Sequence, residues 1–110
     1  MRGCYVIKVF SLLRRREDWT REEFQRWWIE DHIHYAKKLP GLRKYKVSLT
    51  KGSTTHEGQE PFDGVAELWF DSREALEAAW DSDVGLEAVG HSQANVSNRV
   101  VLITEEHEII

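Results

Sequence analysis

The chain has 110 residues, of which 41% are hydrophobic and 31% are charged, which suits one globular domain spanning residues 1–110 rather than a disordered chain. Its formal net charge of -4 argues against a nucleic-acid partner, which requires an excess of lysine and arginine on one face. No apolar run approaches the roughly 20 residues that cross a membrane, and a single cysteine, Cys4, excludes an internal disulfide and is compatible with the cytoplasm.

The first predicted element is a strand at residues 5–13, YVIKVFSLL, which is rich in β-branched and aromatic side chains. Ile7 and Val9 share one face of this strand, and Val6 and Phe10 share the other. A strand that is apolar on both faces is expected to be covered on both. A lysine within the run and three arginines after it favour a strand over a signal peptide.

A helix is predicted next, from Thr20 to about Leu39. Thr20 is a suitable N-cap, and Glu23 completes a capping box. Trp19 and Phe24 occupy the two positions of a hydrophobic staple. A Pro-Gly pair ends the helix.

The remaining elements complete a β-α-β-β-α-β order, which predicts an α+β, ferredoxin-like fold with a four-stranded antiparallel sheet and helices on one face. The other face of the sheet would be bare although it is apolar, so we expect a homodimer formed through the sheet face. The predicted elements are strands at 42–50 and 65–70, a helix at 73–80 capped by Asp71 or Ser72, an irregular helix over 81–98 that two glycines weaken, and a strand with a tail at 99–110.

The segment FQRWWIEDHIHYA places two tryptophans, a tyrosine and two histidines on the first helix. Side chains at helical spacing form one stripe that should face the sheet. His34 falls outside it and is expected to face solvent. The stripe comprises Phe24, Trp28, Asp31, His32, Tyr35 and Leu39.

Two interpretations of this stripe stay open. Trp28 and His32 are either core residues, with His32 a satisfied buried histidine, or one wall of a reactive pocket. The second interpretation is supported by Asp31 and Tyr35, since a carboxylate, an imidazole and a phenol would converge beneath one helix. We expect burial to lower the pKa of His32 and Asp31 to compensate only in part, giving a value at or somewhat below about 6.5.

Other candidates lie farther along the chain. His56 is in a polar loop and could fold over a pocket mouth, and His91 has the helical spacing to point inward. Glu67 lies on the same face of its predicted strand as Trp69. It is either a catalytic acid or base, or a structural ion-pair partner of Lys8 or of an arginine. The histidine spacing does not predict a metal site, because neighbouring histidines of an H-x-H pattern diverge on a helix.

Residues 12–45, LLRRREDWTREEFQRWWIEDHIHYAKKLPGLRKY, resemble the signature of the EthD family. That signature has a basic loop, a capped helix with F-x-x-x-W-x-x-x-H, and P-G-L-x-x-Y at the start of a strand. Residues 63–80, DGVAELWFDSREALEAAW, are similar to the family's third strand and second helix. The resemblance implies a dimeric α/β barrel and a link to ether degradation.

The chain is also similar to methylmuconolactone methylisomerases, in WF-x-S-x-E after the third strand and TEE near the end. This similarity implies that His32, Tyr45 and His56 fall in the pocket. The chain departs from these enzymes because it has no cysteine near the pocket, and the corresponding third-strand position is Leu68.

Together these features predict a small-molecule enzyme, or an auxiliary protein, of aromatic or ether catabolism that binds a compact organic ligand between the sheet and the first helix. His32 would be the general acid/base of an isomerisation or a cofactor-free oxidation. Tyr45 and Asp31 would orient it or the ligand, and no cofactor is expected. The alternatives are a non-catalytic metabolite-binding protein and a haem-binding protein that uses His91 or His32. The apolar walls would come from Trp28, Tyr35 and Trp69.

Overall fold

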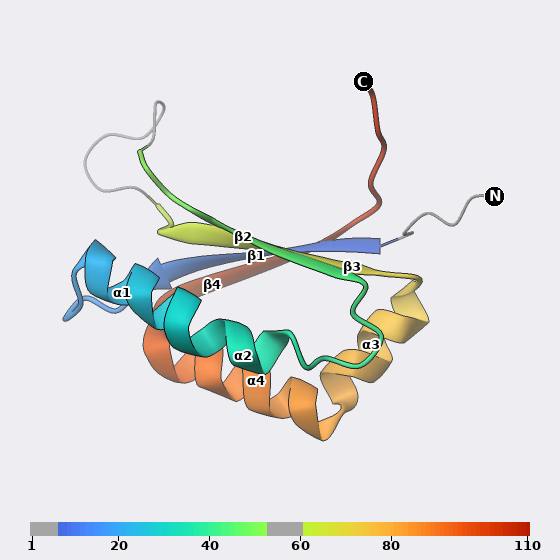
Figure 1. Ribbon diagram of the computed structural model, residues 1–110, viewed down its shortest axis with the longest axis horizontal. Coiled ribbons are helices and arrows are strands. Elements are labelled where there is room, and N and C mark those ends of the chain that lie inside the picture. Colours follow the sequence, from blue (N-terminus) through green and yellow to red (C-terminus); the bar gives the residue numbers. More distant parts are fainter. Residues whose placement is uncertain (1–6, 53–60) are drawn as a thin grey trace.

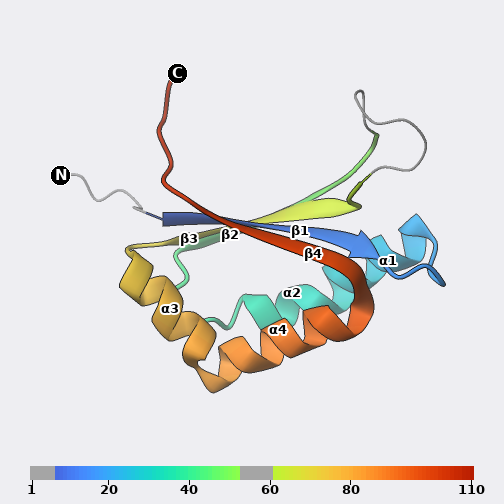
Figure 2. The ribbon, with the colours of Figure 1, turned by 180° about the vertical axis from the view of Figure 1, so that it is seen from behind.

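The computed structural model describes residues 7–52 and 61–110. Four antiparallel strands form one sheet in the order β2-β3-β1-β4, and all helices cover the same face of it (Figures 1 and 2). The predicted α+β, ferredoxin-like fold is therefore confirmed. The strands are β1 (Ile7–Arg15), β2 (Lys44–Leu49), β3 (Gly64–Phe70) and β4 (Val96–Thr104).

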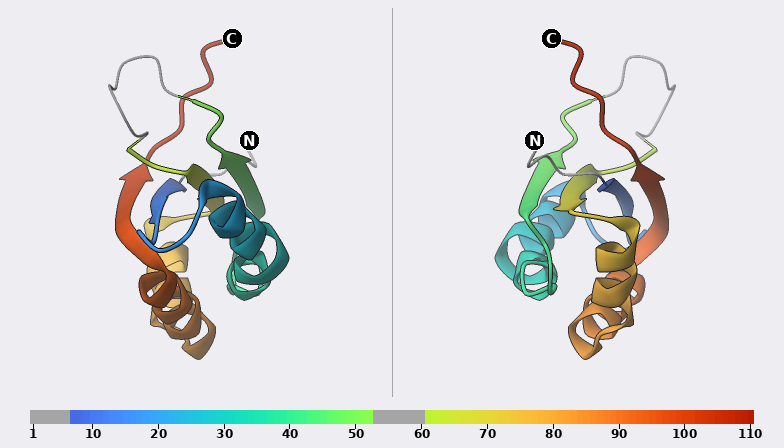
Figure 3. Two further views of the ribbon diagram at one scale, coloured as in Figure 1. Left: turned by 90° about the vertical axis from the view of Figure 1, so that its left-hand side faces the viewer. Right: turned by 90° about the vertical axis from the view of Figure 1, so that its right-hand side faces the viewer.

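The helices form two groups that lie side by side beneath the sheet (Figure 3). The first group follows β1 and lies on the β2 side, and the second follows β3 and lies on the β4 side. None of the described helices is long and apolar enough to cross a membrane. The helical segments are α1 (Arg21–Trp27), η1 (Trp28–His32), α2 (Ile33–Ala36), α3 (Arg73–Asp81) and α4 (Asp83–Asn95).

Local sequence signals fix the helix starts as predicted. The Thr20 side chain accepts a hydrogen bond from the Glu23 backbone N–H, and the Glu23 carboxylate accepts one from the Thr20 N–H. Trp19 packs on Phe24 with ring centroids 6.3 Å apart. Of the two residues proposed to cap α3, Ser72 does so.

The first helical group is not the continuous α-helix that the sequence predicted. Its middle segment, η1, is a π-helix, and the last α-helical residue is Ala36, three residues short of the expected end. Phe24, Trp28 and His32 recur every four residues, and on a regular α-helix each such step drifts by about 40° around the axis. The wider π turn offsets this drift, so Trp28 and His32 both face the sheet. Such turns are often found at functional sites.

The helix predicted as irregular is instead regular along α4, which begins at a new N-cap, Ser82. Gly85 lies at the corner between α3 and α4, where a Cβ atom would collide with the backbone of Ala79 and Trp80. This glycine thus permits a close helix corner rather than weakening the helix.

The two faces of the sheet differ in character. The helix-facing side carries the core, including Val9, Leu13 and Phe70. The open side carries apolar side chains interleaved with charged ones, and Leu102 there is 49% exposed. The C-terminal segment after β4 rises on this open side (Figure 1).

Candidate functional site

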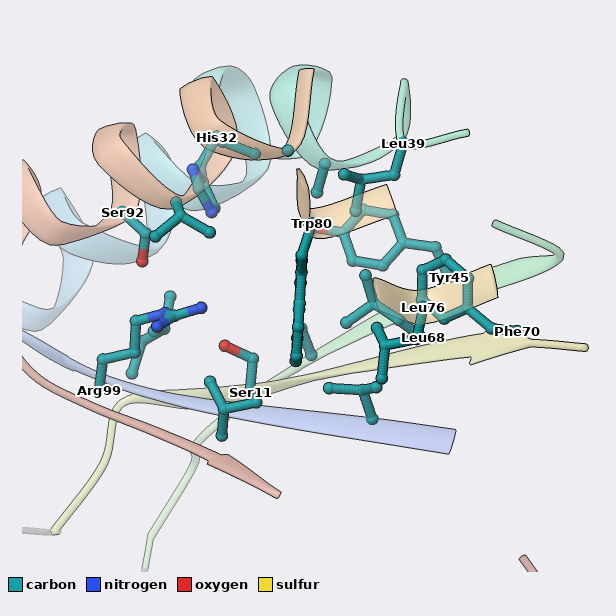
Figure 4. A pocket seen from close by; sticks show the side chains of 18 of the residues that line it. Ser11, His32, Leu39, Tyr45, Leu68, Phe70, Leu76, Trp80, Ser92 and Arg99 are labelled. Carbon is teal, nitrogen blue, oxygen red and sulfur yellow. The ribbon is translucent and has the colours of Figure 1, made fainter. Parts of the chain in front are cut away.

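A cavity of about 60 Å³ lies between the helices and the helix-facing side of the sheet. Most of its lining is aliphatic or aromatic, and Trp80 stands in the middle of it (Figure 4). This volume holds several water molecules, since one needs roughly 10–15 Å³ measured in this way. The polar side chains that line the cavity are Ser11, His32, Tyr45, Ser92 and Arg99.

His32 reaches the cavity from the π segment, and only 7% of the residue is exposed to solvent. Burial lowers the pKa of His32 to about 4, with further lowering by His91 and Arg99, while the Asp31 carboxylate opposes the change. The expected direction and the opposing effect of Asp31 are confirmed. The contributions of His91 and Arg99 were not foreseen. At neutral pH the ring is therefore an uncharged imidazole.

The Nδ1 atoms of His32 and His91 lie 2.9 Å apart. One ring must donate and the other accept, so the contact requires at least one neutral imidazole. Nε2 of His91 lies 3.4 Å from a carboxylate oxygen of the exposed Asp31. If Nε2 of His91 carries a proton toward Asp31, its Nδ1 accepts from His32, which leaves Nε2 of His32 free as a base. Asp31, His91 and His32 thus form a chain from the surface to the cavity.

Aromatic rings hold this histidine pair in place. Trp27 stacks on His32 at 4.8 Å between centroids, with an angle of 15° between the planes. Tyr35 stacks on His91 at 3.9 Å and 9°. The predicted convergence of Asp31, His32 and Tyr35 therefore exists, but Asp31 and Tyr35 reach His91 rather than the cavity.

Trp28 and Tyr45 both line the cavity, as the sequence suggested. Trp28 is fully buried and packs edge-on against Phe24. Burial raises the pKa of Tyr45 to about 12, so the phenol stays protonated at neutral pH and can donate a hydrogen bond. Tyr45 lies at the opposite end of the cavity from His32, with Trp80 between them (Figure 4). It is placed to contact a ligand, not to orient the histidine.

Glu67 and Trp69 do not share the cavity with His32, which corrects their expected place in the pocket. Side chains alternate along β3, so both residues lie on the open face while Leu68 lines the cavity. Glu67 pairs there with Lys8 at 3.0 Å, and the Trp69 indole N–H donates to Glu106. Of the two roles left open for Glu67, the observed contact is that of a structural partner of Lys8.

The other three histidines considered from the sequence differ in their surroundings. His34 is exposed, as expected. His56 lies outside the residues that the structure describes. His91 lies beside the cavity rather than on its wall, and contacts His32 directly.

Sequence reasoning missed Arg99 and Ser92. Arg99 belongs to the helix-facing side of β4, where it pairs in register with Leu13. Burial lowers the pKa of its guanidinium. The sequence pattern did not place it, because both parities of this strand are apolar, with Val100 and Leu102 on one face and Val101 and Ile103 on the other. Ser92 carried no distinctive signal apart from following His91.

The site offers no evident metal centre within residues 7–52 and 61–110, where no group of three or more suitable side chains is arranged to hold an ion. A haem macrocycle does not fit a cavity of about 60 Å³. The donor set fits a small organic molecule instead, since an apolar wall with a few polar groups is typical of such sites.

The fold and the cavity define an α+β protein of the ferredoxin-like type with an internal pocket between its sheet and helices. Residues 16–98 match the model of the EthD domain. That match covers most of the chain, which therefore belongs to the EthD family.

Several individual proteins are similar to this chain in sequence or in structure. The chain is 27% identical over 107 residues to a 4-carboxymethyl-4-methylbutenolide mutase of Pseudomonas reinekei, covering 92% of this chain and 98% of the relative. An EthD family protein of Bacillus halodurans has a similar crystal structure, with a TM-score of 0.80, 26% identity and coverage of 93% and 99%. A dimeric ferredoxin-like protein of Thermobifida fusca superposes with a TM-score of 0.68 at 18% identity, covering 94% of this chain and 93% of that one.

Proposed function

We propose that this protein is an enzyme that moves a proton within a compact, partly apolar organic molecule bound in the cavity. The observation that carries the proposal is the His32 ring, which is uncharged at neutral pH and lines an otherwise largely apolar cavity. An imidazole in this state can accept a proton from carbon. The Pseudomonas reinekei relative is named as a mutase of a carboxymethyl butenolide, which favours an isomerisation, and membership of the EthD family leads us to propose a role in the breakdown of aromatic or ether compounds.

The geometry suggests how the residues would divide the work. Nε2 of His32 takes a proton from one carbon of the ligand and returns it to another, so no co-reactant is consumed. His91 accepts from Nδ1 of His32 and fixes its tautomer. Tyr45, protonated at the far end of the cavity, donates a hydrogen bond to the oxygen on which charge develops.

The second candidate is a protein that binds a metabolite without changing it. A base works best when its pKa is near the working pH, and a pKa of about 4 makes His32 a weak base in the ligand-free state. This observation favours simple binding unless the ligand itself raises the pKa of His32.

Deuterium uptake from solvent separates the two candidates without knowledge of the natural substrate. A set of small lactones and ketones, with and without carboxymethyl groups, is incubated in D₂O with the protein, and incorporation at carbon is followed by mass spectrometry. We expect incorporation with the wild type and its loss in His32→Gln. His34→Gln is the matched control, because His34 is an exposed histidine on the same helical group. Equal incorporation in His32→Gln would refute the role of His32. Ligand binding without any deuterium incorporation would refute the enzyme and support the second candidate, a protein that only binds a metabolite.

We also propose that a second copy of the chain covers the open sheet face. Phe10 pairs with Leu102, and Leu12 with Val100, so apolar side chains form a continuous patch across β1 and β4. Burying such a patch is favourable at about 25 cal/mol per Å². The dimeric relative of Thermobifida fusca has the same fold.

Light scattering coupled to size exclusion tests this assembly. We expect a dimer for the wild type and a monomer for Leu102→Glu. Leu86→Glu is the matched control, because Leu86 is 64% exposed on α4, which lies on the helical side, and this variant should remain dimeric. A wild-type monomer at micromolar concentration would contradict the proposal.

A further inference from the structure

We propose that Arg99 and Ser92 form a subsite for a carboxylate group, so that the natural ligand is a small monocarboxylic acid. Both side chains line the cavity, on the same side of it as His32 (Figure 4). The proposal deepens the proposed function by naming the substrate class, and it rests on that function only for the reaction that follows binding.

Arg99 is a cation placed where a protein rarely leaves one alone. Its Nε atom is buried and has no hydrogen-bond partner. Across residues 7–52 and 61–110, no carboxylate forms an ion pair with Arg99. The rest of the residue is only partly buried, but guanidinium groups stay charged in proteins, so a partly desolvated one without a counter-ion is unfavourable. A ligand anion would supply the missing partner.

Ser92 is the second, independent observation. The residue is 3% exposed, and its Oγ atom has no hydrogen-bond partner. Serine within a helix commonly bonds to a carbonyl of the preceding turn, but no such bond is formed here. A buried hydroxyl that points into a cavity and has no hydrogen-bond partner indicates that a bound ligand supplies this partner.

A carboxylate fits this pair better than other anions. The planar guanidinium matches the two oxygens of a carboxylate in a bidentate arrangement, and the hydroxyl of Ser92 can donate to one of them. A phosphate dianion would need more positive charge than one arginine provides. Most of the remaining lining is apolar, which suits a short hydrocarbon or lactone body attached to the carboxylate.

The subsite also connects binding to the state of His32. The charged or titratable groups around this ring are His91 from α4, Asp31 from η1, Tyr35 from α2, Arg99 from β4 and, at the far end, Tyr45 from β2. Arg99 lowers the pKa of His32. Burial is the largest cause of the lowered pKa of His32 and Arg99 is a smaller one, so an anion bound to Arg99 would offset part of the shift and raise the pKa of His32.

Levulinate, which carries a carboxylate and a ketone, is a suitable probe. Its binding is measured by calorimetry, and the pKa of His32 by NMR titration of the ring, with methyl levulinate and inorganic phosphate as the uncharged and dianionic comparisons. We expect saturable binding of levulinate, little binding of the other two, and a higher His32 pKa in the complex. Arg99→Gln should weaken levulinate binding by about 10- to 100-fold, and Ser92→Ala by about 3- to 10-fold.

Arg73→Gln is the matched control, because Arg73 is an exposed arginine paired with Glu77, and it should bind levulinate like the wild type. Thermal unfolding of each variant verifies that it is folded. The proposal is overturned if levulinate does not bind, if the ester or phosphate binds as well as levulinate, or if Arg99→Gln retains wild-type affinity.

The outcomes also distinguish this inference from the proposed function. Levulinate binding that depends on Arg99, without deuterium uptake that depends on His32, would support the subsite and refute the catalysis. Uptake that depends on His32 but is equal for charged and uncharged ligands would support the catalysis and refute the subsite.

Discussion

Acidification should destabilise this protein through His32, and the His32→Gln variant should lack that part of the pH dependence. The ring is 7% exposed, and the pKa of His32 is lowered from 6.5 to about 4. In the unfolded chain the same imidazole returns to its ordinary value. The unfolded state therefore binds a proton at a pH where the folded state does not, which favours unfolding as the pH falls.

The magnitude follows from the two pKa values of His32. Above pH 6.5 the ring is neutral in both states and contributes no pH dependence. As the pH falls, the loss of unfolding free energy reaches about 2 kcal/mol at pH 5 and about 3 kcal/mol at pH 4, and it levels off below that. This is a large part of the 5–15 kcal/mol that is usual for a small domain, roughly speaking.

Urea unfolding followed by tryptophan fluorescence at several pH values between 7 and 4 measures the effect. Carboxylates also titrate in this range, so the relevant quantity is the difference between wild type and His32→Gln. The groups around the ring, His91, Asp31 and Arg99, are present in both proteins. We expect the wild type to lose about 2 kcal/mol more than the variant between pH 7 and pH 5. Parallel pH profiles for the two proteins would refute the burial of a neutral imidazole.

Three further predictions concern the surroundings of the site. Asp63→Ala should lower the free energy of unfolding by about 3 kcal/mol, because the fully buried carboxylate accepts two hydrogen bonds from Arg15, which would lose both the bonds and its counter-ion; chemical denaturation measures this loss. Gly64→Ala should cost about 1–3 kcal/mol and displace Trp28, since the added Cβ would lie 2.6 Å from the Trp28 ring; a crystal structure of the variant would show the shift. His91→Phe keeps an aromatic ring for stacking but removes the imidazole whose electrostatic interaction lowers the pKa of His32, so an NMR titration should give a higher His32 pKa.

The parts of the fold that depend on local chemistry could be predicted from the sequence. The capping box of Thr20 and Glu23 and the packing of Trp19 on Phe24 involve residues three to five positions apart, so their spacing alone fixes them. The order of strands and helices was sufficient for the ferredoxin-like sheet, because few arrangements of these elements avoid crossed connections.

The site could be predicted only in part, for two physical reasons. A π turn changes the phase of a helix, so Asp31 and Tyr35 were assigned to the sheet-facing stripe but lie against His91 instead. On β3 both parities are largely apolar, so nothing in the pattern says which face the helices cover, and Trp69 was placed with the wrong neighbours.

Arg99 and Ser92 show the remaining difficulty, and they also show why α4 is central to the site. Arg99 reaches the cavity that His32 lines through the pairing of β4 with β1, where it lies opposite Leu13, and no local pattern reports this long-range arrangement. Ser92 and His91 are adjacent on α4, so the hydroxyl proposed to hold a ligand and the imidazole that contacts His32 belong to one turn of one helix. A core that needed only volume would place apolar side chains at these positions, since a partly buried cation without a counter-ion and a buried hydroxyl without a partner both reduce stability. Their presence is explained by a ligand anion, which would satisfy both groups and at the same time offset the contribution of Arg99 to the lowered pKa of His32, a contribution smaller than that of burial.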